Sequence, residues 1–172
     1  AFSLMQSWPA LFFVIVDFGI NAIAARELSK DWTKANKYLG NILIIRLIFS
    51  LGLIFLLSAG LNFFPYSPEL KNGIRLGLFV LLTQSLYSTT NIFFQVKLKY
   101  DFSTIAYTLG YLVIFFLVIL FSRLKLDIAW VNFSYVIGGV ITFLLSLYFV
   151  GKIGVKPEFS IDKGLWRFLF SA

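Results

Sequence analysis

The sequence predicts an all-α membrane protein, a polytopic helix bundle with about five complete transmembrane helices plus the start of a sixth. The first observation is composition, because 59% of the 172 residues are hydrophobic and only 13% are charged. A soluble domain of this length cannot bury so much apolar surface, so lipid must be the solvent. The second is that the apolar residues form runs near the ~20 residues that a ~30 Å hydrocarbon layer requires. The third is that no run alternates as a barrel strand does.

The complete spans are expected at approximately residues 4–25, 40–61, 73–94, 102–121 and 129–150, and a further run opens at about Leu165. Each should be an α-helix, because backbone polar groups in lipid need hydrogen-bond partners within their own segment. The runs follow one another without a polar domain between them, so residues 1–172 form a single membrane domain. The chain begins without Met and ends inside an apolar run, which favours an internal fragment of a longer membrane protein.

Basic residues are distributed unevenly between two sets of alternate connections. The set near residues 26–38, 97–101 and 152–164 carries nine of them: Arg26, Lys30, Lys34, Lys37, Lys97, Lys99, Lys152, Lys156 and Lys163. The other set carries four: Lys71, Arg75, Arg123 and Lys125. The positive-inside rule therefore places the first set in the cytoplasm. Topology, and not binding of nucleic acid, explains the net charge of +7.

The segment between Arg26 and Leu39 allows two interpretations. Its apolar residues recur at helical spacing opposite a basic face, which is typical of a short helix lying on the cytoplasmic leaflet: Leu28, Trp32, Ala35 and Leu39. The alternative is a solvated connector.

The sequence contains no signature of an enzyme. It has no Cys and no His, which removes disulfides, thiolate metal sites and the commonest general base. It also lacks a phosphate-binding glycine loop, and its outer connections are too short for an extramembrane domain. We therefore predict no catalytic residue, no metal site and no cofactor.

Asp17 lies deep inside the first apolar run. A carboxylate at the centre of a membrane helix costs about 2.5–3.5 kcal/mol on insertion scales. Its i+4 neighbour Asn21 can form a hydrogen bond but carries no charge, and Arg26 is about 13 Å away along the helix axis. Neutralisation must come from another span, from water or from protonation. Asp17 and Asn21 therefore either hold helices together or take part in ion coupling.

Arg46 lies inside the second run, about 8–9 Å from its cytoplasmic edge. Its side chain has two options. It can extend back to the headgroups, or it can turn inward to the depth of Asp17 in the preceding antiparallel span. We hypothesise that Asp17 and Arg46 approach one another or face a common aqueous cavity.

The third run carries a stripe of polar residues on one helical face, spaced at i, i+4, i+7 and i+11: Gln84, Ser88, Asn91 and Gln95. Interhelical hydrogen bonds, at about 0.6 kcal/mol each, are one explanation. The length of the stripe favours the other, a hydrated wall suited to sugar hydroxyls. In the fourth run a polar patch fits either a wall or a helix contact: Thr104, Tyr107, Thr108 and Tyr111.

Small residues recur every four positions in the fifth run: Ser134, Gly138, Thr142 and Ser146. This spacing permits close approach of two helices, so we interpret it as packing. Gly40, Gly52 and Gly110 are weaker cases of the same kind.

Residues 17–21 read Asp-Phe-Gly-Ile-Asn, and residues 26–28 read Arg-Glu-Leu ahead of a basic connector. This order resembles the Wzx-type polysaccharide flippases of the multidrug/oligosaccharidyl-lipid/polysaccharide exporter superfamily. In these proteins the second span commonly ends in Asp-x-Gly-(Leu/Ile)-Asn, followed by Arg-Glu-Leu. The spacing of the later spans and the sequence Pro-Glu-Phe-Ser at residues 157–160 also fit that layout.

The resemblance implies the N-terminal lobe of a transporter in the bacterial inner membrane, with two lobes around a central cavity and membrane lipids around both. Such a protein moves undecaprenyl-diphosphate-linked oligosaccharide to the outer leaflet by alternating access, for cell-surface polysaccharide biosynthesis. Arg26 and Arg46 would then attract the diphosphate, and the polar stripe of the third run would bind sugars. Asp17 and Asn21 would couple a proton or sodium ion, or staple helices.

Three other interpretations stay open. A cation-coupled multidrug antiporter of the same superfamily would share the membrane carboxylate, but its cavity should be acidic. A membrane-embedded polysaccharide polymerase would need a large outer loop with catalytic side chains. An assembly subunit would use the polar residues only to join helices.

Overall fold

The computed structural model describes residues 2–17 and 19–171, and every regular element within them is a helix. The elements are α1 (Phe2–Asp17), α2 (Ile20–Lys30), the 3-10 helix η1 (Trp32–Lys34), α3 (Ala35–Gly60), the 3-10 helix η2 (Leu61–Phe63), α4 (Pro68–Val96), α5 (Tyr100–Arg123), α6 (Ile128–Lys152) and α7 (Lys163–Ser171). The all-α class predicted from the sequence is confirmed.

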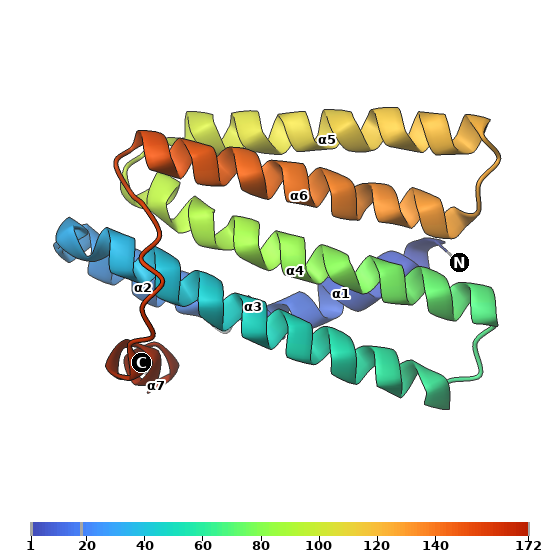
Figure 1. Cartoon of the computed structure of the whole chain (residues 1–172), viewed down its shortest axis with the longest axis horizontal. Helices are drawn as coiled ribbons and strands as arrows, with labels where there is room; N and C mark the ends of the chain where they lie inside the picture. Colours follow the sequence, from blue (N-terminus) through green and yellow to red (C-terminus); the bar gives the residue numbers. More distant parts are fainter. Residues whose placement is uncertain (1, 18, 172) are drawn as a thin grey trace.

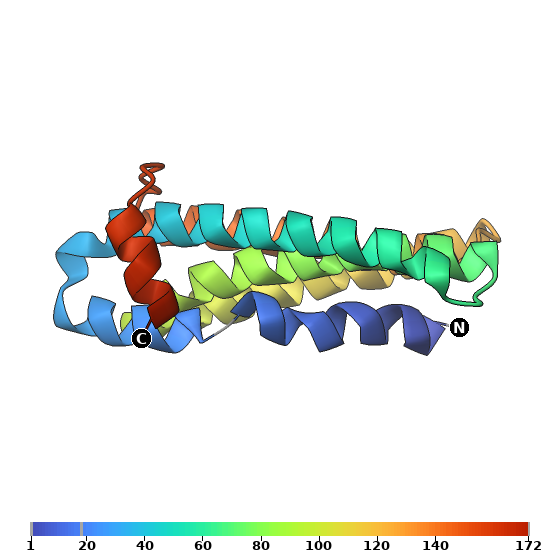
Figure 2. The same ribbon diagram turned by 90° about the horizontal axis from the view of Figure 1, so that it is seen from below.

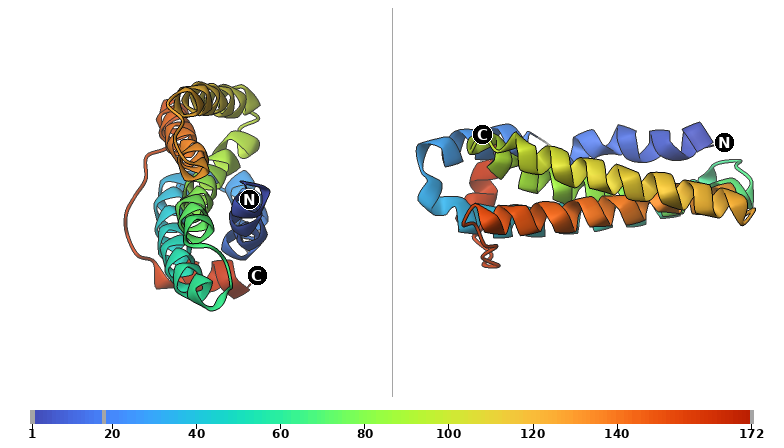
Figure 3. Two further views of the ribbon diagram at one scale, coloured as in Figure 1. Left: turned by 90° about the vertical axis from the view of Figure 1, so that its right-hand side faces the viewer. Right: turned by 90° about the horizontal axis from the view of Figure 1, so that it is seen from above.

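The long helices α3, α4, α5 and α6 run side by side along the length of the molecule, with α4 between α3 and α6 (Figure 1). α4 also packs against α1, and α5 packs mainly on α6. Along the bundle axis, α3 and α6 lie on one side of α4, whereas α1 and α5 lie toward the other (Figure 3). α4 is therefore the central helix, and its remaining face lies between α1 and α5.

The connections predicted to be cytoplasmic, which carry more lysine and arginine, all lie at one end of the bundle (Figure 1). They are residues 31–34 between α2 and α3, 97–99 between α4 and α5, and 153–162 between α6 and α7. The connections at 64–67 and 124–127 lie at the opposite end. The alternation of connections expected from the charge pattern is therefore present in the fold.

The first predicted span, 4–25, is not one continuous helix. It is divided into α1 and α2, which are bent by 43° relative to one another at a short break. Gly19 lies in this break and adopts a left-handed conformation with φ 73°, which glycine reaches at no steric cost. The apolar run predicted helix for this segment correctly, but it did not reveal the interruption.

The segment after Arg26 does not form a separate surface helix, so that interpretation was wrong. α2 continues to Lys30, Asp31 is extended, and η1 leads directly into α3. The Asp31 carboxylate accepts a hydrogen bond of 3.1 Å from the backbone N–H of Thr33, which caps η1 and competes with continuation of α2. The chain therefore reverses direction within a short connector.

Within the described residues, three helical stretches are long and apolar enough to cross a membrane, and a fourth crossing results if the bent pair α1–α2 is one span. The three are Trp32–Phe63, Tyr100–Arg123 and Ile128–Lys152. α4 has 29 residues but is not among them, because its polar side chains lower its hydropathy. Five complete spans were expected; the crossing by α4 stays a prediction.

After α6 the chain passes over the first turns of α3 and reaches α7, which lies across the bundle and not along it (Figure 2). The amides of Lys156 and Glu158 donate to the side-chain and backbone oxygens of Asn36, at 3.0 and 3.1 Å. Gly40 permits this approach, since a Cβ there would lie 1.9 Å from the carbonyl oxygen of Glu158. α7 begins where a sixth run was expected.

Small residues bring α5 and α6 together, as their spacing predicts. A Cβ on Gly110 of α5 would lie 1.8 Å from the hydroxyl of Thr142 and 3.0 Å from the carbonyl oxygen of Gly138, both on α6. Gly52 differs, because nothing lies within 4 Å of the position its Cβ would take. The packing interpretation is therefore confirmed for Gly110 and Gly138 and wrong for Gly52.

Candidate functional site

An ion pair joins two charged residues inside the bundle. Nη2 of Arg46, on α3, donates to Oδ1 of Asp17, the last residue of α1, at 2.6 Å. The Arg46 side chain is fully buried, whereas 28% of the Asp17 side chain is exposed. The hypothesis that these two residues approach one another is confirmed.

Neighbouring polar groups extend the network around Arg46, whose Nε is buried without a hydrogen-bond partner among the described residues. The same Nη2 donates to Oδ1 of Asn21 at 2.9 Å, and Nη1 donates to the carbonyl oxygen of Ser85 at 2.6 Å. The Asn21 amide donates in turn to Asp17 at 2.7 Å and to the hydroxyl of Ser88 at 2.8 Å. One side chain of α3 is thereby hydrogen-bonded to α1, α2 and α4.

The network lies between two clusters of buried apolar side chains. One cluster contains Ile20 and Ile45, and the other contains Val16. A charge in such surroundings is costly unless it is paired and hydrogen-bonded. Asp17 has a further need for a cation, because it ends α1, where the helix dipole disfavours negative charge and no basic residue lies in the last turn. Arg46 supplies that cation from α3.

Asp17 also borders an open cavity of about 400 Å³, together with Phe13, Val14 and Gly19. The carboxylate is thus both paired and accessible. Among the residues that the structure describes, no group of three His, Cys, Asp or Glu could hold a metal ion.

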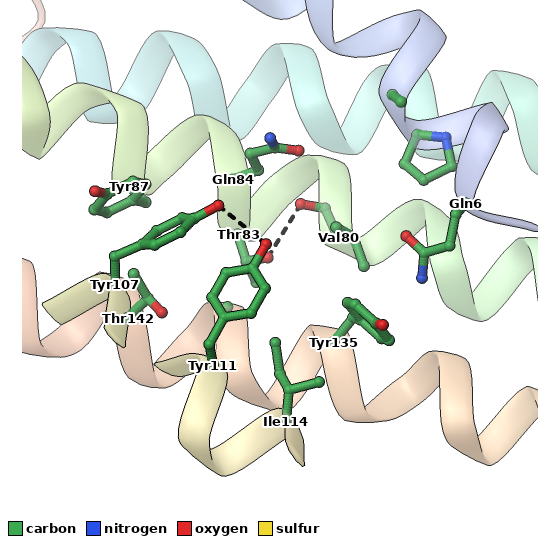
Figure 4. Close-up of a pocket in the computed structure, with 13 residues that line it drawn as sticks. Gln6, Val80, Thr83, Gln84, Tyr87, Tyr107, Tyr111, Ile114, Tyr135 and Thr142 are labelled. Atoms are coloured by element: carbon green, nitrogen blue, oxygen red, sulfur yellow. Dashed lines mark hydrogen bonds between the residues drawn. The ribbon is translucent and has the colours of Figure 1, made fainter. Parts of the chain in front are cut away.

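A second cavity, of about 330 Å³, lies between α1, α4, α5 and α6 (Figure 4). It adjoins the middle of these long helices, at residues 80–87 of α4, 107–114 of α5 and 135–142 of α6. None of its lining residues is charged, and eight of them carry a hydroxyl or an amide. Four of the eight are tyrosines: Tyr87, Tyr107, Tyr111 and Tyr135.

Hydrogen bonds connect the polar groups around this cavity. The hydroxyl of Tyr107 donates to that of Tyr111 at 3.0 Å (Figure 4). The hydroxyls of Tyr87 and Ser103 lie 2.8 Å apart, and Ser103 donates to Oδ1 of Asn91 at 2.7 Å. α4 and α5 are therefore joined by hydroxyl and amide groups beside the cavity.

The polar stripe predicted on α4 is divided among different surroundings. Gln84 is exposed and lines the cavity. Ser88 is bonded to α2 and Asn91 to α5, whereas Gln95 is exposed at the end of α4. Interhelical hydrogen bonds thus account for the two middle members, and Gln84 alone of the four lines the described cavity.

Arg26 belongs to neither arrangement. Its side chain is 59% exposed, and Nε lies 3.2 Å from the carboxylate of Glu27. Lys30 pairs with the same carboxylate at 2.9 Å. Arg26 therefore lies on the surface at the basic end of the bundle, apart from the buried network.

A family model described as polysaccharide biosynthesis protein matches residues 1–172, which is the whole sequence. The chain belongs to this family. The polysaccharide biosynthesis family includes Wzx-type flippases, so the resemblance drawn from the motif after Asp17 is confirmed. No curated protein and no solved structure matches the chain. With its several candidate spans, this polysaccharide biosynthesis protein is a multi-pass membrane protein.

Sequence reasoning did not identify four of the polar residues that line the cavity of this polysaccharide biosynthesis protein: Gln6, Thr83, Tyr87 and Tyr135. One signal was available. Tyrosine is common near the two interfaces of a membrane, where its ring contacts the apolar layer and its hydroxyl meets water. A tyrosine well inside a span needs another partner for its hydroxyl. Tyr87 and Tyr135 occupy such positions in the third and fifth predicted spans.

Proposed function

We propose that this polysaccharide biosynthesis protein forms the N-terminal lobe of a flippase in the bacterial inner membrane. The flippase moves undecaprenyl-diphosphate-linked oligosaccharide from the cytoplasmic to the outer leaflet by alternating access. The observation that carries the proposal is the uncharged polar cavity among helices of a membrane bundle, in a chain of this family. Hydroxyl and amide groups replace the water that a sugar loses on entering the membrane. In this arrangement the end of the bundle whose connections carry nine basic residues faces the cytoplasm.

The oligosaccharide follows the polar side of α4. Gln84 meets it in the cavity, and the rest of the stripe continues the wall toward the basic end: Ser88, Asn91 and Gln95. Their hydrogen bonds to α2 and α5 are exchanged for bonds to sugar hydroxyls, which costs little because one polar partner replaces another.

The diphosphate is attracted to the basic end, where Arg26 is exposed. Arg binds phosphate oxygens through strong, charge-assisted hydrogen bonds where water is scarce. Arg46 can take part only after it separates from Asp17, because both of its Nη atoms are engaged in the closed network.

Asp17 and Asn21 couple substrate movement to a proton or a sodium ion. An ion at the accessible Asp17 carboxylate neutralises the charge that holds Arg46. Arg46 is then released for the diphosphate, and the contacts among α1, α2 and α4 are loosened in the same step. The interpretation of Asp17 as a simple helix staple predicts no such coupling.

The test uses the full-length protein in vesicles of phosphatidylethanolamine and phosphatidylglycerol, with fluorescent undecaprenyl-diphosphate oligosaccharide in one leaflet. The labelled lipid should appear in the other leaflet at a rate that depends on the protein. Asp17→Asn combined with Arg46→Met should fold, because no uncompensated charge remains, yet it should lose ion-driven transport. Asp127→Asn is the matched control. Asp127 occupies the N-cap position of α6, but its carboxylate makes no capping hydrogen bond there.

Each competing function has its own outcome in the same vesicles. A wild-type protein that leaves the labelled lipid in place contradicts the flippase proposal. Export of cationic dyes in its stead indicates a multidrug antiporter, and formation of longer polymer indicates a polymerase. Full transport by the double variant indicates that the ion pair only joins helices.

A further inference from the structure

We propose that the cavity between α1, α4, α5 and α6 binds one uncharged sugar ring of the substrate by stacking it on tyrosine faces. This inference rests on the proposed function and narrows it to substrates whose sugar at this position carries no ionised group. The juxtaposition that supports it is a row of aromatic rings facing amide side chains in a cavity without charged residues (Figure 4).

The aromatic surface is formed by α5 and α4. The rings of Tyr107 and Tyr111 lie one helical turn apart on α5, with centroids separated by 4.6 Å. Tyr87 of α4 extends the row, at 5.9 Å from Tyr107. The face of an aromatic ring is electron-rich, and the C–H groups on one side of a sugar ring carry partial positive charge, so the two surfaces attract each other.

These rings are available to a ligand. Tyr107 and Tyr111 are 47% and 49% exposed in the described chain, although they lie near the middle of a long helix. Tyr107 donates to Tyr111, so a purely apolar contact with lipid would leave the hydroxyl proton of Tyr111 without an acceptor in hydrocarbon, which is costly. A sugar satisfies both parts of the residue, because its C–H face covers the ring and its hydroxyls meet the phenol oxygen.

Polar groups at the edges of the cavity complete the fit. Tyr107 donates its hydroxyl proton to the oxygen of Tyr111, so the Tyr111 hydroxyl can donate its own proton to a ligand. Gln84 contributes an exposed amide from α4, and Gln6 and Tyr135 contribute polar groups from α1 and α6. A sugar is a donor and acceptor at each hydroxyl, which suits amides and phenols alike.

The size and charge of the cavity define the ligand further. Its volume of about 330 Å³ lies at the lower end of the ~300–1,000 Å³ found for small-molecule sites. It therefore receives one sugar and not the entire oligosaccharide. No lysine or arginine lines it, so a uronate or a phosphorylated sugar would enter without a counter-charge, at a large desolvation cost. Neutral hexoses and N-acetylhexosamines meet both conditions.

The experiment measures affinity in the full-length protein reconstituted in lipid nanodiscs. Three probes are compared: undecaprenyl diphosphate bearing a neutral trisaccharide, the same lipid bearing a uronate-containing trisaccharide, and undecaprenyl diphosphate without sugar. The wild type should bind the neutral probe most tightly. Tyr111→Ala should weaken that binding about tenfold and leave the sugar-free lipid unaffected. Tyr111→Phe keeps the ring and should weaken it only about threefold.

Tyr111→Leu and Tyr148→Ala are the controls. Tyr111→Leu keeps an apolar side chain without an aromatic face, so it should behave as Tyr111→Ala does. Unchanged binding of the sugar-free lipid by both variants shows that they are folded. Tyr148 is exposed on α6 and does not line the cavity, so its replacement should change nothing.

Two results overturn the inference. One is equal affinity of the wild type for the lipid with and without the neutral trisaccharide. The other is unchanged affinity for the neutral probe in Tyr111→Ala. Either result can occur in a protein that flips the lipid in vesicles, whereas failure of flipping contradicts the proposed function and is measured separately.

Discussion

Arg46 on α3 and Asp17 on α1 form an ion pair of 2.6 Å in which the cation is fully buried and the anion is partly exposed. This asymmetry determines how the pair can open. In the proposed coupling, an ion that arrives from outside reaches the carboxylate and not the guanidinium, so it competes with Arg46 for the same oxygen atoms. The buried cation is then the member of the pair that must find another partner.

The first prediction concerns the stability of this pair. Asp17→Asn should lower the free energy of unfolding by about 3–5 kcal/mol, because it leaves Arg46 charged and uncompensated in the interior. Arg46→Met added to that variant should recover part of the loss, since the stranded charge is gone. Thermal unfolding of the single and double variants in detergent gives the coupling energy. Additive losses would contradict a direct interaction.

The second prediction compares two glycines of the long helices. Gly110→Ala should destabilise the protein by about 1–3 kcal/mol, because its Cβ would lie 1.8 Å from the Thr142 hydroxyl. Gly52→Ala is the matched control. Nothing lies within 4 Å of its Cβ, and alanine favours the helix by up to ~1 kcal/mol, so stability should rise or stay unchanged. Equal losses at both positions would show that Gly110 is not a packing site.

The third prediction concerns the linker between α6 and α7. Gly40→Ala should displace it from α3, because the new Cβ would collide with the backbone of Glu158. Amide hydrogen exchange should become faster in residues 156–162, while exchange in α5 stays slow. Gly60→Ala, with nothing within 4 Å of its Cβ, serves as the control. Unchanged hydrogen exchange in residues 156–162 would show that the linker does not pack against α3 at Gly40.

The fourth prediction concerns pH. A hydrogen bond from the Lys37 ammonium lowers the pKa of Asp162, assisted by backbone amides of Leu165 and Gly164. A carboxylate with a lowered pKa stabilises the folded state above its unfolded value of 3.8, and that contribution is lost as pH falls through the lower, folded pKa. The start of α7 should therefore stay docked from pH 7 to pH 5 and loosen only below about pH 4.

Fluorescence of Trp166 reports this change, because its indole N–H donates to Asn41 at 2.9 Å in the docked arrangement. The measurement uses a variant in which the other three tryptophans are replaced by Phe: Trp8, Trp32 and Trp130. Asp162→Asn removes the titrating group and should flatten the profile below pH 5. A transition near neutral pH in the parent variant would contradict the assignment.

The ion pair could be predicted from the sequence because the argument needs only the positions of the two residues along the chain. Asp17 and Arg46 lie at comparable depths in successive antiparallel runs, and a charge in lipid requires a partner. The close packing of α5 on α6 followed equally from the spacing of Gly138 and Thr142. Both expectations depend on the rise per residue of a helix and on the cost of burying each residue type, and both follow from the sequence without knowledge of the tertiary structure.

The tyrosine-lined cavity could not be anticipated in the same way. It requires residues of α1, α4, α5 and α6 to face one another, and the relative rotation of four helices is set by side-chain packing along their whole length. The break after Asp17 was missed for a related reason, since an isolated glycine within an apolar run fits a continuous helix as well as an interrupted one. The stripe on α4 was seen, but its partners on two other helices were not.

The partners of Arg46 have a mechanical consequence. Its two Nη atoms bind α1, α2 and α4 at once, so a slide of α3 by even one turn would break all of these bonds together. While the guanidinium stays in place, its bonds oppose any slide of α3 against α1, α2 and α4. In the proposed coupling, an ion that released Arg46 from Asp17 would therefore weaken the attachment of α3 to three helices in a single step.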